Sequence, residues 1–174
     1  MPKVFQYGSN TSVTRLNSAD RLNGAASVIG IARTLDNYDL DFAVWSKTNK
    51  CAAADIVPGG NVKIWGVLYE IPENLIDRKL SGDKKSLDEI ESEGKNYKRT
   101  NIQVLANNEP DNILTAITYV VINRVQNIET SLEYASEIIN GLKSHEIPYD
   151  YLEYVQNRIL QNNRVLQGKL PSLI

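Results

Sequence analysis

The stretch VKIWGVLYEI, residues 62–71, decides the fold class. Its apolar side chains alternate along the chain with the two-residue period of a β-strand. One face carries Trp65, Val67, Tyr69 and Ile71, and the other carries Val62, Ile64 and Leu68. Because a strand that is apolar on both faces is buried on both sides, we predict that 62–71 lies at the centre of a sheet or in the wall of a barrel.

Strand patterns continue on both sides of this stretch, and helical patterns follow them. The predicted strands are 4–7, 27–35, 38–44, 51–57, 97–105 and 113–122, of which the last two form a hairpin. From Ser131 the apolar period becomes helical, and Pro148 separates two predicted helices. Strands first and helices last predict an α+β fold, a small, mostly antiparallel β-barrel with flanking helices, in one domain over residues 1–174.

Composition excludes several classes of partner. The 174 residues are 42% hydrophobic and 23% charged with a net charge of −2, which is typical of soluble globular proteins. No basic stretch with interleaved aromatics appears, which argues against nucleic acid or an anionic membrane as main partner. No apolar run could span a bilayer, and no signal-peptide core follows the first residues. We expect a cytoplasmic protein, as a monomer or a homodimer.

The single cysteine and the single histidine limit the chemistry. Cys51 and His145 cannot build a Cys/His zinc site by themselves, and a Ser-His or Cys-His pair would need His145. His145 lies near a predicted helix end, where histidines commonly cap carbonyl groups or interact with the helix dipole. Cys51 precedes three alanines and is interpreted as a small core residue. We therefore expect any catalysis to use carboxylate, hydroxyl and main-chain groups.

The acidic stretch SLDEIESEG, residues 86–94, contains one carboxylate that does not fit a solvated helix face. Each helical residue turns the side chain by about 100°, which puts Ile90 and Glu91 on either side of Leu87. Glu91 thus shares the apolar face, while Asp88, Glu89 and Glu93 are predicted to point away. A carboxylate at the edge of a core is a candidate general base because desolvation raises its pKa. Ordinary burial at a core edge is the alternative.

A second candidate site follows the first predicted strand. Tyr7-Gly8-Ser9-Asn10 joins that strand to a predicted short helix, residues 13–21. A strand, a glycine turn and a helix start leave several main-chain N–H groups unpaired, and such a cradle can hold an anion or a developing oxyanion. A plain strand-to-helix turn is the alternative. The motif is not a nucleotide-binding P-loop, because no Gly-Lys-Ser/Thr is present.

Together these motifs resemble the γ-glutamylcyclotransferase family over nearly the whole chain. Tyr7-Gly8-Ser9-Asn10 is similar to the family's YGSN substrate loop, and Leu87-Asp88-Glu89-Ile90-Glu91 followed by Tyr97 resembles its LDxxE…Y segment. Further similar segments occur in the same order at residues 29–33, 65–69, 134–141 and 148–151. One departure is Ser92, because the family usually has glycine directly after its catalytic glutamate. Gly94 follows Glu93 instead, so an alternative alignment makes Glu93 the acid; the spacing from Leu87-Asp88 favours Glu91.

The resemblance implies one reaction, in which a γ-glutamyl amide cyclises to 5-oxoproline and releases an amine or amino acid. It implies Glu91 as the general acid and base, and Tyr7, Gly8, Ser9, Asn10 and Tyr119 as substrate-binding residues, without metal or cofactor. Tyr119 would hydrogen-bond the substrate or Glu91, or else be a core aromatic, and Tyr97 is expected to serve packing. Arg15, Arg21 and Arg33 are open candidates for binding a substrate carboxylate. The alternative function is a non-catalytic member of the same fold that binds a small ligand or a protein.

Overall fold

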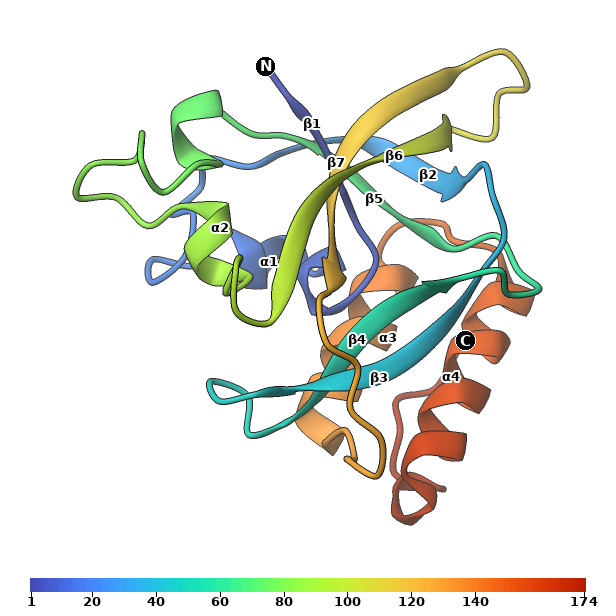
Figure 1. Cartoon of the computed structure of the whole chain (residues 1–174). Helices are drawn as coiled ribbons and strands as arrows, with labels where there is room; N and C mark the ends of the chain where they lie inside the picture. The colour runs from blue at the N-terminus through green and yellow to red at the C-terminus, as the bar shows by residue number, and fades with distance from the viewer.

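The computed structural model describes residues 1–174 and contains seven β-strands, four α-helices and three 3-10 turns. Figure 1 shows the strands of the barrel above a separate strand pair and two long helices. The strands are β1 (Lys3–Gln6), β2 (Ser27–Thr34), β3 (Tyr38–Ser46), β4 (Cys51–Pro58), β5 (Trp65–Glu70), β6 (Tyr97–Ala106) and β7 (Ile113–Val121). The helices are α1 (Val13–Leu16), α2 (Leu87–Ile90), α3 (Leu132–Lys143) and α4 (Tyr149–Asn162), and the 3-10 turns are η1 (Ser9–Thr11), η2 (Glu73–Leu75) and η3 (Arg164–Leu166).

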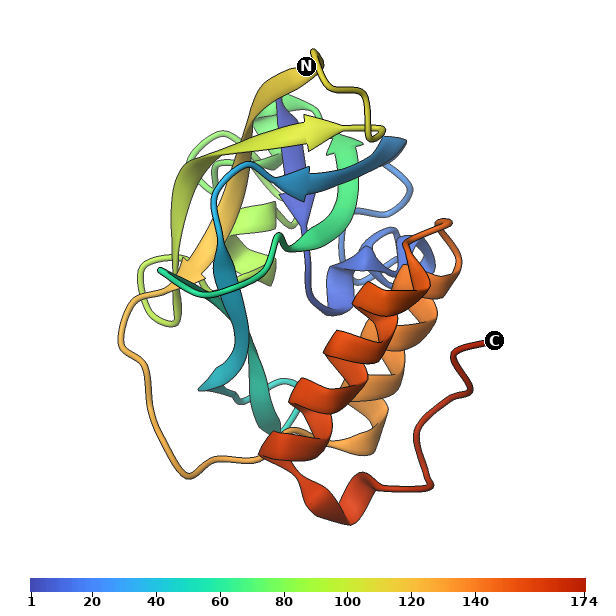
Figure 2. The same ribbon diagram turned by 90° about the vertical axis from the view of Figure 1, so that its right-hand side faces the viewer.

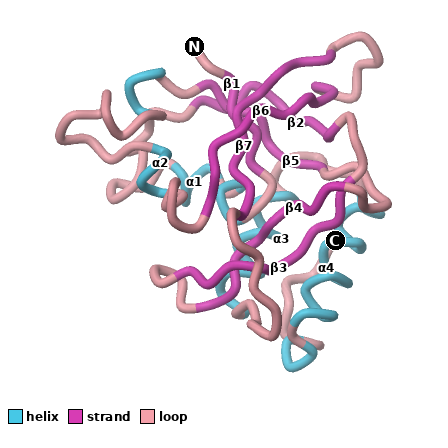
Figure 3. The backbone as a smooth tube through the Cα atoms, viewed as in Figure 1, coloured by secondary structure: helices cyan, strands magenta, loops and turns pink.

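Five strands close into a barrel in the order β1-β5-β2-β6-β7. Neighbouring strands are antiparallel except for the closing pair, β1 with β7, which is parallel. The hairpin predicted from strands 97–105 and 113–122 is β6–β7, paired from Tyr97 opposite Val121 to Leu105 opposite Ile113. The predicted α+β fold with a small, mostly antiparallel barrel and flanking helices is confirmed (Figure 3).

The doubly apolar stretch 62–71 forms part of the barrel wall, as predicted, although its regular strand is shorter. Strand β5 lies between β1 and β2, and its four central residues are buried. Val62 makes only an isolated bridge to Tyr38, and Ile64 bonds through its main chain to Thr34 outside the regular ladder. The close approach of β1 requires glycine in β5, because a Cβ at Gly66 would lie 2.2 Å from the carbonyl oxygen of Gln6.

Strands β3 and β4 form a separate two-stranded antiparallel sheet, and the two long helices lie beside it. Figure 2 shows α3 and α4 running side by side along this ribbon. Helix α4 is attached to β3 at Leu40, whose N–H donates to the Tyr154 hydroxyl (3.0 Å) and whose carbonyl accepts from Arg158 Nε (2.7 Å). As predicted, Cys51 is a buried core residue at the start of β4. None of the helices is both long and apolar enough to cross a bilayer.

The predicted helix over residues 13–21 is wrong beyond its first turn, because α1 ends at Leu16. Side chains that compete for main-chain groups end it. The Asn17 amide bonds in both directions with the main chain of Ala26, at 2.9 Å each, and the Ser18 hydroxyl donates to the carbonyl of Arg15 (2.9 Å). Asn17 thereby ties the end of α1 to the chain that enters β2.

Candidate functional site

The Tyr7–Asn10 loop leaves the barrel at the end of β1 and is held on three sides. Thr11 turns the chain back, since its N–H and its hydroxyl both bond to the carbonyl of Gly8, at 3.1 and 2.8 Å. The buried Tyr69 hydroxyl donates to the carbonyl of Asn10 (2.9 Å). Helix α3 packs against the loop at Gly141, where no side chain separates the two backbones. The strand-turn-helix arrangement was predicted, although its first turn is the 3-10 turn η1.

The main-chain N–H groups of Gly8, Ser9 and Asn10 have no acceptor within the protein. All three residues line one small cavity, which we call the inner pocket; its volume is about 20 Å³. Consecutive unpaired N–H groups at the start of a helical turn favour a negatively charged group. The loop thus leaves three consecutive N–H groups unpaired, as the sequence predicted; that they hold an anion stays a prediction.

Glu91 faces this loop from the other side of the inner pocket. It is the C-cap of α2, whose start is fixed by a capping box between Ser86 and Glu89. Its Oε1 atom accepts two hydrogen bonds, from Asn10 Nδ2 (2.8 Å) and from Gln6 Nε2 (3.1 Å). Glu91 is the only carboxylate among the residues that line the inner pocket, which are Gln6, Tyr7, Gly8, Ser9, Asn10, Ala54, Glu91, Tyr97, Tyr119 and Tyr134.

Burial raises the pKa of the Glu91 carboxyl above its ordinary value. The hydrogen bonds from Asn10 and Gln6 act in the opposite direction, as do the charges of Arg21 and Arg15, and desolvation outweighs them. A carboxylate whose pKa is moved towards neutrality accepts and releases a proton more readily near pH 7. The site therefore holds a group suited to acid–base chemistry.

Glu93, the alternative acid, lies away from the inner pocket. Its Oε2 atom is 3.6 Å from Arg78 Nη2, and both side chains are partly exposed. The residue between the two glutamates accounts for the departure from the family pattern. Ser92 has a φ of +51°, in the left-handed region that favours glycine. The backbone after Glu91 thus has the conformation that glycine would adopt, which supports the alignment of Glu91 with the family's glutamate.

Replacing Ser92 with glycine is expected to stabilise the fold by about 0.5–1 kcal/mol. Glycine removes the strain of the left-handed backbone, while its greater conformational entropy in the unfolded chain cancels part of this gain. Urea unfolding of the two proteins measures the difference. Ser136→Gly, in the regular part of α3, is the matched control and should destabilise. A loss of stability in Ser92→Gly would contradict the prediction.

Four of the ten residues that line the inner pocket are tyrosines, and three of their hydroxyls bond to main-chain groups. Tyr7 donates to the carbonyl of Tyr119 (2.6 Å), and Tyr97 donates to the carbonyl of Ala54 (2.5 Å). The Tyr134 hydroxyl accepts from the N–H of Ala54 (3.0 Å). Strand β4 therefore positions two of the rings, and Tyr97, expected only to pack, lines the site.

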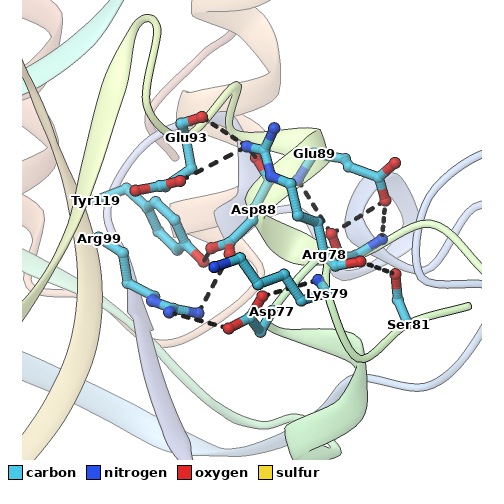
Figure 4. A network of polar contacts seen from close by, with 10 residues as sticks. Asp77, Arg78, Lys79, Ser81, Asp88, Glu89, Glu93, Arg99 and Tyr119 are labelled. Carbon is cyan, nitrogen blue, oxygen red and sulfur yellow. Dashed lines mark hydrogen bonds and ion pairs between the residues drawn. The ribbon is translucent and has the colours of Figure 1, made fainter.

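Asp88 contradicts the prediction that it points away from the core. Its side chain is buried, with Oδ1 accepting from the Tyr119 hydroxyl (2.8 Å) and Oδ2 from Arg99 Nη1 (3.2 Å), as Figure 4 shows. Leu87 and Asp88 are both buried in this single turn, whereas Glu89 is exposed, as predicted. Tyr119 lines the pocket as predicted, but its hydroxyl bonds to Asp88 and not to Glu91.

A wider hollow, which we call the outer cleft, opens from the inner pocket and shares Ser9, Asn10, Glu91, Tyr97 and Tyr134 with it. Its volume is about 370 Å³. It extends to the turn between β3 and β4, residues 46–49. The structure separates the three candidate arginines: Arg15 and Arg21 line the cleft, whereas Arg33 lies over the ring of Trp65 in the barrel wall, 5.8 Å from its centroid.

His145 lies outside both cavities. Its Nε2 atom is 3.3 Å from the carbonyl oxygen of Thr11 in η1, so its side chain contacts the loop and does not cap the carbonyl groups at the end of α3. No group of three or more His, Cys, Asp or Glu side chains is arranged to hold a metal ion.

Comparison with known proteins identifies the family. The model of the AIG2-like family matches residues 63–155, which are 93 of the 174 residues. The chain belongs to the AIG2-like family. The matched region contains Glu91 and Tyr119 but not the Tyr7–Asn10 loop.

Solved structures similar to this AIG2-like chain agree with the fold. A structure titled "Gamma-glutamyl cyclotransferase" has 23% identity and a TM-score of 0.73, covering 89% of this chain and 86% of its own. An uncharacterized protein from Homo sapiens has 25% identity and a TM-score of 0.72, covering 88% and 85%. YkqA from Bacillus subtilis has 20% identity and a TM-score of 0.69, covering 98% of this chain and 55% of its own. Among curated proteins, no sequence matches the chain.

Two residues of this AIG2-like site were missed by sequence reasoning. Gln6 is the last residue of β1, and nothing in its local pattern indicates that it reaches a carboxylate 85 positions later. Tyr134 lies on the apolar face of α3 and looks like an ordinary core residue. The available signal was the tyrosine hydroxyl on an apolar helix face, because a buried hydroxyl needs a hydrogen-bond partner.

The raised pKa of Glu91 predicts how the stability of this AIG2-like protein depends on pH. The folded state holds the Glu91 proton more tightly than the unfolded state, so this group's contribution falls as pH rises from the unfolded pKa of about 4.3 to the folded pKa. Glu91→Gln removes that dependence. Urea unfolding between pH 4 and 8 should show that the free energy of unfolding of the variant rises relative to that of the wild type as the pH rises through this window. A constant difference across the range would contradict the prediction.

Proposed function

We propose that this protein is a γ-glutamylcyclotransferase, which converts a γ-glutamyl amide into 5-oxoproline and a free amine or amino acid. The observation that carries the proposal is the position of Glu91. Glu91, whose pKa is raised, lines the same small pocket as three consecutive residues with unpaired N–H groups. Membership of the AIG2-like family and the fold shared with a structure titled as a γ-glutamyl cyclotransferase support it.

The cyclisation needs no nucleophile from the protein, because the α-amino group of the substrate attacks its own γ-carbonyl carbon. That amino group is an ammonium near pH 7 and must first lose a proton, which Glu91 accepts. A bond forms between the α-nitrogen and the γ-carbon, and the bond from that carbon to the leaving nitrogen breaks. In total two protons pass from the attacking nitrogen to the leaving nitrogen, which departs as an ammonium. Glu91, which lines the inner pocket, is the proposed carrier of these protons.

Negative charge develops on the γ-carbonyl oxygen when the ring closes. The N–H groups of Gly8, Ser9 and Asn10 are the proposed donors to that oxygen, and a single such donor contributes about 2.7–4 kcal/mol in enzymes where one was removed. Because η1 is held by Thr11, Tyr69 and α3, these donors need little reorganisation during the reaction.

Tyr7 and Tyr119 are proposed to bind the substrate through their rings. Their hydroxyls bond to the carbonyl of Tyr119 and to Asp88, respectively. The rings are therefore fixed walls that bring the amine and the carbonyl together, and proximity of this kind lowers the barrier of an intramolecular attack.

The test is an assay for 5-oxoproline with purified protein and three substrates: γ-glutamyl-alanine, γ-glutamyl-ε-lysine and glutathione. Formation of 5-oxoproline well above the uncatalysed rate from any of them supports the proposal, and the preferred substrate identifies the leaving group. Absence of product from all three, together with a melting shift on adding 5-oxoproline, would favour the alternative of a protein that only binds a small ligand.

A further inference from the structure

Arg15 and Arg21 are cations of the outer cleft that have no anionic partner in the protein. Neither lies within 4.0 Å of a carboxylate, in contrast to Arg99 with Asp88 and Arg124 with Asp55. Each bonds instead to a neutral side-chain amide, Arg15 Nη2 to Asn49 Oδ1 (2.7 Å) and Arg21 Nη1 to Asn10 Oδ1 (3.0 Å).

Arg15 is also unsatisfied at a buried atom. Its Nε is inaccessible to solvent and has no hydrogen-bond partner. Buried guanidinium N–H groups without an acceptor are rare in folded proteins, and each calls for an explanation. An acceptor supplied by a bound molecule is one such explanation.

The two guanidinium groups lie close enough to repel each other. Burial lowers the pKa of Arg21, and the charge of Arg15 lowers it further. Three lysines, Lys47, Lys85 and Lys95, also line the cleft. Three acids also line it: Glu91 accepts from Asn10 and Gln6, Glu89 accepts from Ser86, and Asp20 accepts from Ser18. The charges of Glu91 and Asp20 offset part of the repulsion at Arg21. Repelling cations gathered in a hollow favour an anionic ligand.

We propose that Arg15 and Arg21 form a binding site for a carboxylate of the substrate. This inference rests on the proposed cyclotransferase function. A guanidinium fits a planar carboxylate with two parallel hydrogen bonds, and it is less strongly hydrated than an ammonium. Asn10 joins the site to the catalytic centre, because it accepts from Arg21 and donates to Glu91. A carboxylate bound there would hold the substrate next to the base.

The carboxylate has two sources in a γ-glutamyl substrate: the α-carboxylate of the glutamyl group, and a carboxylate on the leaving group. Three ligands separate them. γ-Glutamyl-alanine has both carboxylates, γ-glutamyl-methylamide lacks the one on the leaving group, and 4-aminobutanoyl-alanine lacks the α-carboxylate. Binding is measured by titration calorimetry on Glu91→Gln protein, so that ligands are not consumed.

Adding Arg15→Met to the Glu91→Gln protein is expected to weaken binding of γ-glutamyl-alanine at least tenfold. Arg21→Met should also weaken it. One of the two shortened ligands lacks the carboxylate that the site holds. That ligand should bind with the same affinity to Glu91→Gln protein with and without Arg15→Met. Arg15→Lys keeps the charge without the paired donors and should bind with intermediate affinity. Arg33→Met, in the barrel wall, is the matched control and should bind all three ligands as before.

An equal loss of affinity for all three ligands, no loss for any, or the same loss in Arg33→Met would overturn the inference. So would an absence of detectable γ-glutamyl-alanine binding to the Glu91→Gln protein. Failure of the proposed function gives a different result: wild-type protein makes no 5-oxoproline, while carboxylate-dependent binding through Arg15 persists.

Discussion

Glu91→Gln is expected to lower turnover of a γ-glutamyl substrate by about 10²–10⁴-fold, the usual contribution of a general acid–base group. Glutamine has nearly the same shape, and its side-chain oxygen can still accept the bonds from Asn10 and Gln6. What it lacks is the ability to take a proton from the substrate ammonium. The loss should therefore appear in kcat, measured as 5-oxoproline released per enzyme per second, with a smaller change in KM.

Glu93→Gln is the matched control for that experiment. It makes the same chemical change two residues away, at a side chain that pairs with Arg78 on the surface, so turnover should stay within about twofold. Unfolding curves of both variants establish that they are folded. Loss of turnover in Glu93→Gln with full activity in Glu91→Gln would identify Glu93 as the acid–base group and would contradict the proposed mechanism.

Gly141→Ala is expected to destabilise the fold by up to about 2 kcal/mol and to lower activity, although no atom of Gly141 lies in the site. In an ordinary helix interior this change is favourable by about 1 kcal/mol. Here the new methyl carbon would lie 2.4 Å from Thr11 Oγ1, 2.6 Å from the N atom of Ser12 and 2.8 Å from the carbonyl carbon of Thr11. Two of these are main-chain atoms, so a rotamer change cannot relieve the overlap, and overpacking of this kind costs about 1–3 kcal/mol.

Relief requires α3 to move away from η1, and η1 carries the N–H groups of Ser9 and Asn10. Urea unfolding measures the first effect and the 5-oxoproline assay the second. Asn140→Ala, on the exposed side of the same helix, is the control and should leave stability unchanged or slightly raised. A stabilised or fully active Gly141→Ala protein would show that the close packing of α3 on the loop is not needed.

Local pattern was sufficient for the long strands of this fold. The period-two alternation of residues 62–71 predicted a strand buried on both faces, and the structure places β5 in the barrel wall. Alternation and turn residues likewise predicted the β6–β7 hairpin and the strands β3 and β4. These predictions succeeded because each strand buries a face whose alternation shows directly in the sequence.

Short elements were predicted less well, because tertiary contacts decide their ends. The predicted helix at 13–21 was shortened to one turn by the side chains of Asn17 and Ser18. Helix α2 is also a single turn, and the angular argument that placed Glu91 inward failed for Asp88. Leu87 and Asp88 are both buried in this one turn, and the buried acid bonds to Tyr119 and Arg99 within the protein.

By itself, the sequence determined the fold class, the family resemblance and the identity of the candidate acid. Those features depend on residue types at fixed spacings along the chain. Only the tertiary structure decided which groups surround Glu91, that Tyr119 bonds to Asp88, and that Arg15 and Arg21 share a cleft without a carboxylate partner. These contacts join residues as far as 85 positions apart, and nothing local records them because barrel closure and the packing of α3 bring them together.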